Sequence, residues 1–150
     1  MDISSAIKQT TFKSKHEMLL INLLYTSNWL RDQHKGFLDK YRMKSQHYNV
    51  LRILKGKHPD PSSPGNIKEV MLDKSPDLTR LIDKLISMNL VYRNECKENR
   101  RKIDVYISDD GIKLLEEIAV GMDDFEVEWK KKLSEDEAEK LSNLLDKLRS

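Results

Sequence analysis

One segment, Ser75–Ile107, constrains the fold most, because the spacing of its apolar residues changes from that of a helix to that of a strand. Its first part places apolar side chains on one helix face without a miss, at residues 78, 81, 82, 85 and 86. After Asn89, a residue that suits the left-handed backbone at helix ends, the apolar residues alternate as in a strand. Two short strands are predicted at 90–93 and 102–107, and the stretch between them is polar and too long for a tight turn. The segment therefore predicts an amphipathic helix followed by a hairpin with a charged tip.

Outside that segment the apolar spacing predicts helices. The long first helix is apolar on more than one side, so it needs two partners, in a core or in a second subunit. Ser108 and Ser134 begin two helices after the hairpin, the second through a capping box with Glu137. Residues 1–14 lack periodicity, and we expect them to fray. The helices predicted before the amphipathic one cover residues 15–42, 45–55 and 66–72.

The start of the amphipathic helix is predicted from Ser75-Pro76. Serine is a good N-cap, and proline suits the first helical position, where its missing N–H is not needed. We therefore expect Ser75 to cap this helix. With the apolar residues turned inward, the opposite face carries the polar side chains of residues 77, 79, 80, 83, 84 and 87.

A short helix, a turn, a strongly amphipathic helix and a charged hairpin, in this order, indicate a winged helix-turn-helix. In that arrangement the first residues of the second helix enter the major groove of DNA and meet base edges. The helix N-terminus also offers N–H groups and a partial positive charge to phosphates. The cationic hairpin tip suits phosphates or a narrow minor groove. The candidate DNA-binding residues are Ser75, Pro76, Asp77, Thr79, Arg80, Lys84, Arg100, Arg101 and Lys102.

The sequence resembles the MarR family of winged helix-turn-helix transcription regulators over roughly residues 15–150. The resemblance rests on L-T-R-L-I-D-K-L (78–85) ahead of M-N-L-V (88–91), and on R-R-K-I-D-V-Y-I-S-D-D-G (100–111), in the same order and spacing. It implies a single domain over 1–150, mainly α with a small β-wing. Within it, about 45–107 would form the DNA reader, and about 15–42 and 109–148 the dimerisation helices.

The resemblance also implies a function. The chain would be a homodimer that binds double-stranded DNA at an inverted-repeat operator, and a repressor relieved by a small-molecule effector. Thr79 and Arg80 would contact the major groove, and Arg101 the minor groove. This sequence departs from the family pattern at two positions that would affect which DNA sequence is preferred. Asn99 replaces the aspartate of the family's wing motif, and Asp77 stands where many relatives have a small or hydroxyl residue. The alternative is a winged-helix protein-interaction module without DNA binding.

Tyr25 and Trp29 lie four residues apart on the long first helix. They are candidates for a ligand pocket between the dimerisation helices and the winged domain, as many family members have. An aromatic pair at this spacing more often belongs to a core or a subunit interface, and that interpretation stays open.

The charge distribution agrees with a DNA-facing half. Residues 1–107 hold 20 Lys and Arg against 12 Asp and Glu, a net charge of +8, whereas residues 108–150 hold 7 against 13, a net charge of −6. A solvated surface would also account for such runs. No catalytic motif, metal-ligand spacing or cofactor-binding loop occurs, so we expect neither an enzyme nor a metal or cofactor site. No span is apolar enough for a membrane, and the single Cys96 fits a cytoplasmic protein.

Overall fold

The computed structural model describes residues 1–95 and 103–150 and confirms a mainly α fold with a small β-sheet. The elements are α1 (Ile3–Ile7), α2 (Lys15–Leu38), a 3-10 turn η1 (Asp39–Tyr41), α3 (Ser45–Lys57), α4 (Pro64–Val70), α5 (Leu78–Ser87), β1 (Val91–Glu95), β2 (Ile103–Ile107), α6 (Asp109–Lys130) and α7 (Glu135–Arg149).

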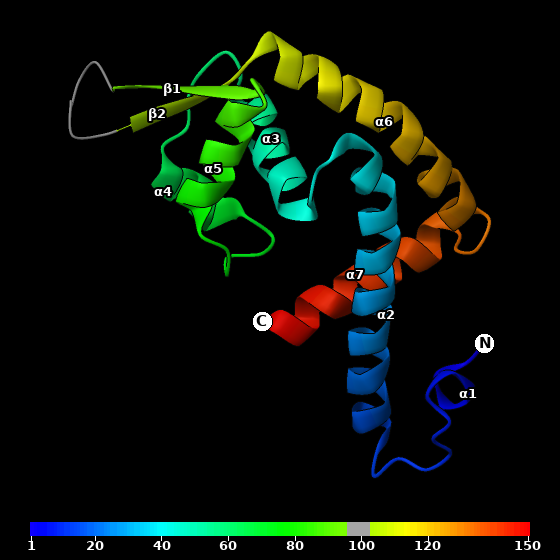
Figure 1. Cartoon of the computed structure of the whole chain (residues 1–150). Helices are drawn as coiled ribbons and strands as arrows, with labels where there is room; N and C mark the ends of the chain where they lie inside the picture. The colour runs from blue at the N-terminus through cyan, green and yellow to red at the C-terminus, as the bar shows by residue number, and fades with distance from the viewer. Residues whose placement is uncertain (96–102) are drawn as a thin grey trace.

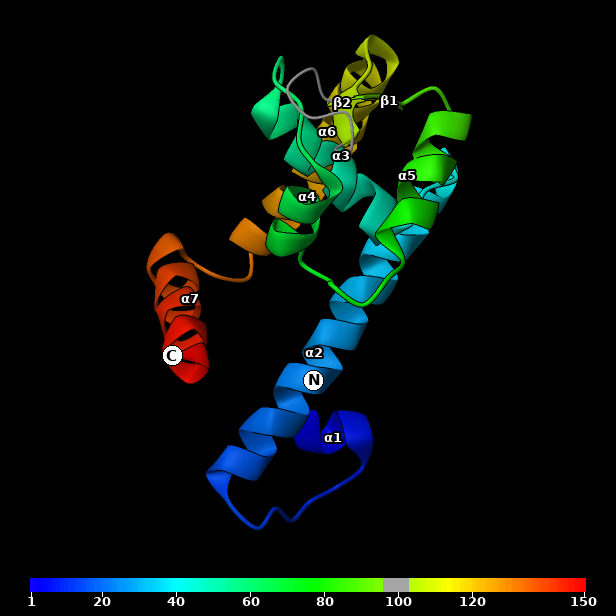
Figure 2. The same ribbon diagram turned by 90° about the vertical axis from the view of Figure 1, so that its left-hand side faces the viewer.

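Helices α3, α4 and α5 gather with the two strands into one group, which we call the winged lobe (residues 45–95 and 103–107). Helix α2 runs away from this lobe toward α1, and α6 arches from the hairpin to α7 (Figure 1). Helix α7 crosses α2 in that view, but Figure 2 shows the two helices apart. The lobe and the long helices are thus separate parts of the molecule, joined where α2 and α6 meet the lobe.

The apolar face of α5 is buried as its spacing predicts. Leu78, Leu81, Ile82 and Leu85 are buried, and Ile86 packs against the same core from a half-buried position. Burying one such side chain stabilises a fold by roughly 1.5–3 kcal/mol, so this face fixes the rotation of α5 about its axis. The core that receives it comes from α3, α4, β2 and α6, through Val50, Leu51, Leu54, Ile67, Val105, Ile107, Leu115 and Ile118.

The hairpin is anchored to the lobe along β2. Strands β1 and β2 pair antiparallel, with Val91 opposite Ile107 and Arg93 opposite Val105. On the other edge of β2, the N–H of Val105 donates to the carbonyl of Ser62 at 3.0 Å, and the N–H of Ser62 donates back at 3.0 Å. The connection between α3 and α4 therefore acts as a third, one-residue strand, and the base of the hairpin is held on both sides.

The start of α5 differs from the sequence-based expectation. The helix begins at Leu78, and its N-cap is Asp77, whose carboxylate accepts from the N–H of Arg80 at 3.3 Å. Ser75 does not cap the helix because it lies two residues before the N-cap, and its hydroxyl donates to Asp73. The predicted stop at Asn89 is confirmed, since this residue has a φ of 59°.

The N-terminal segment also differs from expectation. Residues that we expected to fray form α1, whose N-cap Asp2 accepts from the N–H of Ser5 at 2.8 Å. Ile3 is buried, and α1 lies against α2. A tertiary contact thus stabilises a helix too short to show a periodic pattern.

Within the described residues, no helix combines the length and the apolar character that a membrane crossing requires. In the same part of the chain, no three His, Cys, Asp or Glu side chains lie together as a metal site would need.

Gly121 allows α6 to approach α2 closely. A Cβ at this position would lie 2.5 Å from two ring carbons of Phe37, a buried residue of α2 whose ring also packs edge-on against Phe125. We expect Gly121→Ala to destabilise the fold by about 1–3 kcal/mol, because the ring must move within a packed cluster.

Urea unfolding checks this expectation against Gly36→Ala, a helical glycine of α2 with no atom within 4 Å of its added Cβ. That control should gain up to about 1 kcal/mol from helix propensity. In a Phe37→Leu background, Gly121→Ala should lose less stability than in the natural chain. Equal effects of the two glycine substitutions in the natural chain would contradict the close approach.

The burial of His47 predicts that the stability of the fold depends on pH. It is 7% exposed, and its Nδ1 accepts from the N–H of Lys44 at 3.2 Å at the start of α3. Burial lowers the pKa of His47 below its usual 6.5, and the charges of Lys44 and Lys84 add to the effect. The folded state therefore prefers the neutral ring, and this contribution to stability is complete above pH 6.5 and declines as the pH falls through the lowered pKa.

We expect the free energy of unfolding to decrease between pH 7.5 and pH 5.5 by more in the natural chain than in His47→Gln. Glutamine keeps an acceptor for the N–H of Lys44 but does not titrate. Urea denaturation at several pH values measures both slopes. Parallel slopes for the two proteins would show that His47 does not carry the dependence.

Candidate nucleic-acid interface

The outward face of α5 carries the polar side chains that the sequence predicts there. Thr79, Arg80 and Lys84 are all exposed. The Arg80 side chain is 88% exposed, and its Nε lies 3.5 Å from a carboxylate oxygen of Asp77, a contact that leaves the rest of the guanidinium open. The structure therefore brings an arginine, a hydroxyl and an ammonium group together on one helix face. These groups donate hydrogen bonds to acceptors such as phosphate oxygens and the purine edges of base pairs.

The turn before α5 is held by residues that the sequence reasoning missed. Lys68 of α4 donates from Nζ to the carbonyl of Pro76 at 2.6 Å, and Asn49 of α3 accepts from the N–H of Leu72 at 2.9 Å. Asp73 accepts from both the N–H and the hydroxyl of Ser75. The Asp-x-Ser pattern at 73–75 is the local signal that could have been found, because such residues form turns on their own backbone.

An ion pair joins the hairpin to α5. Arg93 of β1 contacts Asp83 of α5, with 2.9 Å between Nη1 and Oδ1. Both side chains are about half exposed, so the pair contributes modestly to stability, roughly 0.2–1 kcal/mol for exposed pairs. Asp83 belongs to the predicted outward face, while Arg93 was not predicted, since nothing in the sequence pairs residues ten apart across two elements. The pair thus adds a polar contact between the hairpin and α5.

The hairpin tip lies outside the described residues. The candidates Arg100, Arg101 and Lys102 fall in this stretch, as do Asn99 and Cys96. What the structure gives is the base of the hairpin, where Tyr92 and Tyr106 stack across the two strands with ring centroids 5.1 Å apart.

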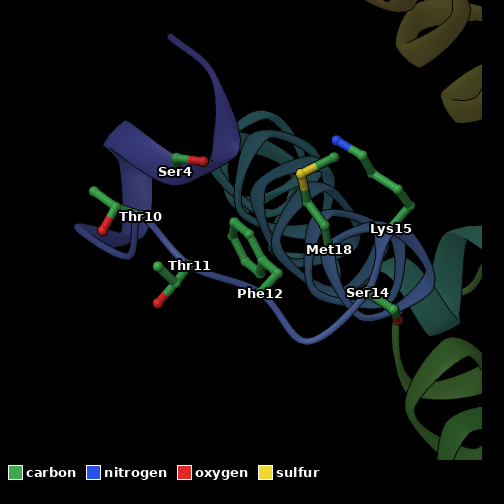
Figure 3. A pocket seen from close by; sticks show the side chains of 7 residues that line it. All are labelled: Ser4, Thr10, Thr11, Phe12, Ser14, Lys15 and Met18. Atoms are coloured by element: carbon green, nitrogen blue, oxygen red, sulfur yellow. The ribbon is translucent and has the colours of Figure 1, made fainter.

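Tyr25 and Trp29 are both exposed on α2, and the Nζ of Lys132 lies 5.8 Å from the centre of the Trp29 ring. They do not line the hollow of about 600 Å³ that the structure contains near the N-terminus. That hollow lies between the α1 segment and the start of α2, where Phe12 and Met18 provide its apolar surface (Figure 3).

The long helices expose much apolar surface. No residue of α7 is buried, and three of its leucines, Leu141, Leu144 and Leu148, are exposed. Large exposed apolar patches mark interaction surfaces in soluble proteins. The residues are Leu20, Leu24, Tyr25 and Trp29 on α2, Val120, Val127 and Trp129 on α6, and Leu141, Leu144 and Leu148 on α7.

Solved structures of transcription regulators share this fold. A MarR transcription factor from Planctomyces limnophilus is 29% identical, with 91% of this chain and 98% of the other covered and a TM-score of 0.70. A MarR-like transcription regulator from Bacillus cereus ATCC 10987 is 19% identical, with coverages of 87% and 93% and a TM-score of 0.77. MepR from S. aureus, solved as a complex with DNA, is 20% identical, with coverages of 90% and 96% and a TM-score of 0.76. No protein-family model matches the sequence, and no curated protein matches it.

Proposed function

We propose that this chain is a MarR-family winged-helix transcription regulator that works as a homodimer on a double-stranded, inverted-repeat DNA operator, as its likeness to solved MarR-type regulators supports. The similar protein from Planctomyces limnophilus is a MarR transcription factor, which supports the role of a regulator and not of an enzyme. We place the protein in the cytoplasm and assign it the role of a repressor that blocks transcription while it occupies the operator.

The observation that carries the proposal is the two-sided character of α5. Its apolar face is buried in the core of the lobe, so Thr79, Arg80 and Lys84 project from the opposite side with exposed side chains. Arg80 suits a bidentate contact to guanine, and Thr79 lies beside it at the end of the helix that enters the groove. Pro76 and Asp77 border the same helix end and would shape the choice of base. The S. aureus relative of the same fold, solved with DNA, supports this use of the fold.

The wing adds contacts at the hairpin tip. We propose that Arg101 enters the minor groove and that Arg100 and Lys102 contact phosphates, because strands β1 and β2 lead directly into this basic stretch. The ion pair between Arg93 and Asp83 supports a hairpin that keeps its direction relative to α5.

Dimerisation would cover the apolar surface of the long helices. Leu141, Leu144 and Leu148 of α7 are exposed in the single chain, and so are Leu20, Leu24, Tyr25 and Trp29 of α2. A two-fold dimer buries the same surface on both subunits and relates two α5 helices by symmetry. The operator would then be an inverted repeat with half-sites about one helical turn, roughly 10 bp, apart.

We propose Tyr25 and Trp29 as contacts for a small-molecule effector that changes the spacing of the two α5 helices. The Lys132 ammonium close to the Trp29 ring supports an aromatic ligand with a negative charge. The same two residues would also serve a subunit interface, and a shift in dimer affinity on ligand addition would connect the two roles.

Binding to DNA is tested first by gel shift with random duplex at low salt, and then by selecting bound sequences from a duplex pool. A protein-interaction module would not bind random duplex at low salt, and the selection would yield no bound DNA sequence. The regulator should select a sequence with two-fold symmetry.

On the selected operator, we expect Arg80→Ala to weaken binding by about 1–3 kcal/mol and to relax the preference at one base pair, because a bidentate contact to guanine is lost. Lys35→Ala, which removes the same charge from α2 outside the winged lobe, is the control and should leave the base preference unchanged. If Arg80→Ala preserves both affinity and preference, α5 does not read the operator.

For the dimer, we expect Leu144→Asp to give a monomer at micromolar concentration, because a charge at an apolar interface is left without a partner. Asn143→Asp adds the same charge to the neighbouring position on α7 and should remain dimeric. Sedimentation equilibrium distinguishes the two. A dimeric Leu144→Asp protein would remove α7 from the interface.

A further inference from the structure

The turn between α4 and α5 is held by side chains from α3 and α4, the two helices directly before α5. Asn49 of α3 accepts from the N–H of Leu72 at 2.9 Å, and Lys68 of α4 donates to the carbonyl of Pro76 at 2.6 Å. Gln46 of α3 donates from Nε2 to Asp73 at 3.4 Å. The backbone that leads into α5 is therefore fixed near its beginning, its middle and its end.

Asp73 stands at the centre of this arrangement, with both carboxylate oxygens engaged. Oδ1 accepts from the N–H of Ser75 at 3.0 Å and from its hydroxyl at 2.6 Å, while Oδ2 accepts from Gln46. The hydrogen bonds from Ser75 lower the pKa of Asp73, with smaller contributions from Gln46 and from the charge of Arg31 on α2. The carboxylate is thus ionised at neutral pH and tied to α3.

The position of this acid is otherwise unfavourable for a DNA-binding protein. Asp73 is exposed and lies five residues before Leu78, the first residue of the helix that faces the groove. A free carboxylate there would repel phosphates. Its hydrogen bonds give it a different role, since they connect α3 to the turn that aims α5.

We propose that Asp73 is a positioning residue for operator recognition: through Gln46 and Ser75 it fixes the turn that directs α5 into the major groove. The inference rests on the proposed function. It also changes the role of Ser75, whose hydroxyl and N–H both donate to Asp73. Ser75 acts through the turn and not by donating a hydrogen bond to DNA.

The test compares Asp73→Ala with Glu69→Ala, an exposed acid of α4 for which the described residues provide no hydrogen bond or ion pair. Affinities are measured for the selected operator and for random duplex at one salt concentration. Asp73→Ala should lower operator affinity on the order of tenfold, as expected for losing a hydrogen bond that positions the helix. Its affinity for random duplex should stay equal or rise. Glu69→Ala should change both affinities in the same direction and keep their ratio.

An acid that acts only by its charge predicts the opposite result. Asp73→Ala would then bind both duplexes more tightly with an unchanged ratio, and this outcome would overturn the proposal. Asp73→Asn retains an acceptor for Ser75 without the charge, so it should keep most of the natural ratio. Gln46→Ala and Ser75→Ala should reduce the ratio of operator affinity to random-duplex affinity, as Asp73→Ala does. If circular dichroism shows that Asp73→Ala is unfolded, these two variants replace it in the comparison.

The two proposals fail separately in these measurements. A natural chain that binds no duplex overturns the proposed function itself. A natural chain that selects an operator, while Asp73→Ala and Gln46→Ala keep the natural ratio of affinities, overturns only the positioning role of Asp73.

Discussion

The burial of one face of α5 against α3, α4 and β1 is the contact on which the rest of the structure depends. Leu81, Ile82 and Leu85 fix how the helix is rotated, and this rotation alone decides that Thr79 and Arg80 face outward. The same core receives Val105 and Ile107 of β2. Helix and hairpin are thus placed relative to each other by shared apolar contacts, and the polar groups between them only refine that placement.

The elements that could be predicted are those fixed by residues close together in the chain. The inward face of α5, the stop at Asn89 and the caps at Ser108 and Ser134 all follow from local spacing, and the structure has them. The outward position of Thr79, Arg80 and Lys84 follows from the same spacing.

The features that could not be predicted depend on a choice between two possible capping residues or on contacts between residues far apart in the sequence. Ser75 and Asp77 are both residue types that cap helices; in the structure Asp77 caps α5, while Ser75 donates to Asp73 in the preceding turn. The α1 helix depends on the burial of Ile3 beside α2, which no pattern within fifteen residues reveals. Gln46, Asn49 and Lys68 reach the turn before α5 from other helices, so their roles become visible only once the chain is folded.

The pairing of Arg93 with Asp83 has a consequence for how this protein responds to its ionic surroundings. Added salt displaces a regulator from DNA through competition for phosphates. Because this half-exposed pair is itself weakened by dissolved ions, its contribution to the placement of the hairpin beside α5 decreases under the same conditions. At high ionic strength the hairpin and α5 are therefore held together mainly by the apolar contacts that they share, and the ion pair adds to their placement mainly in dilute salt.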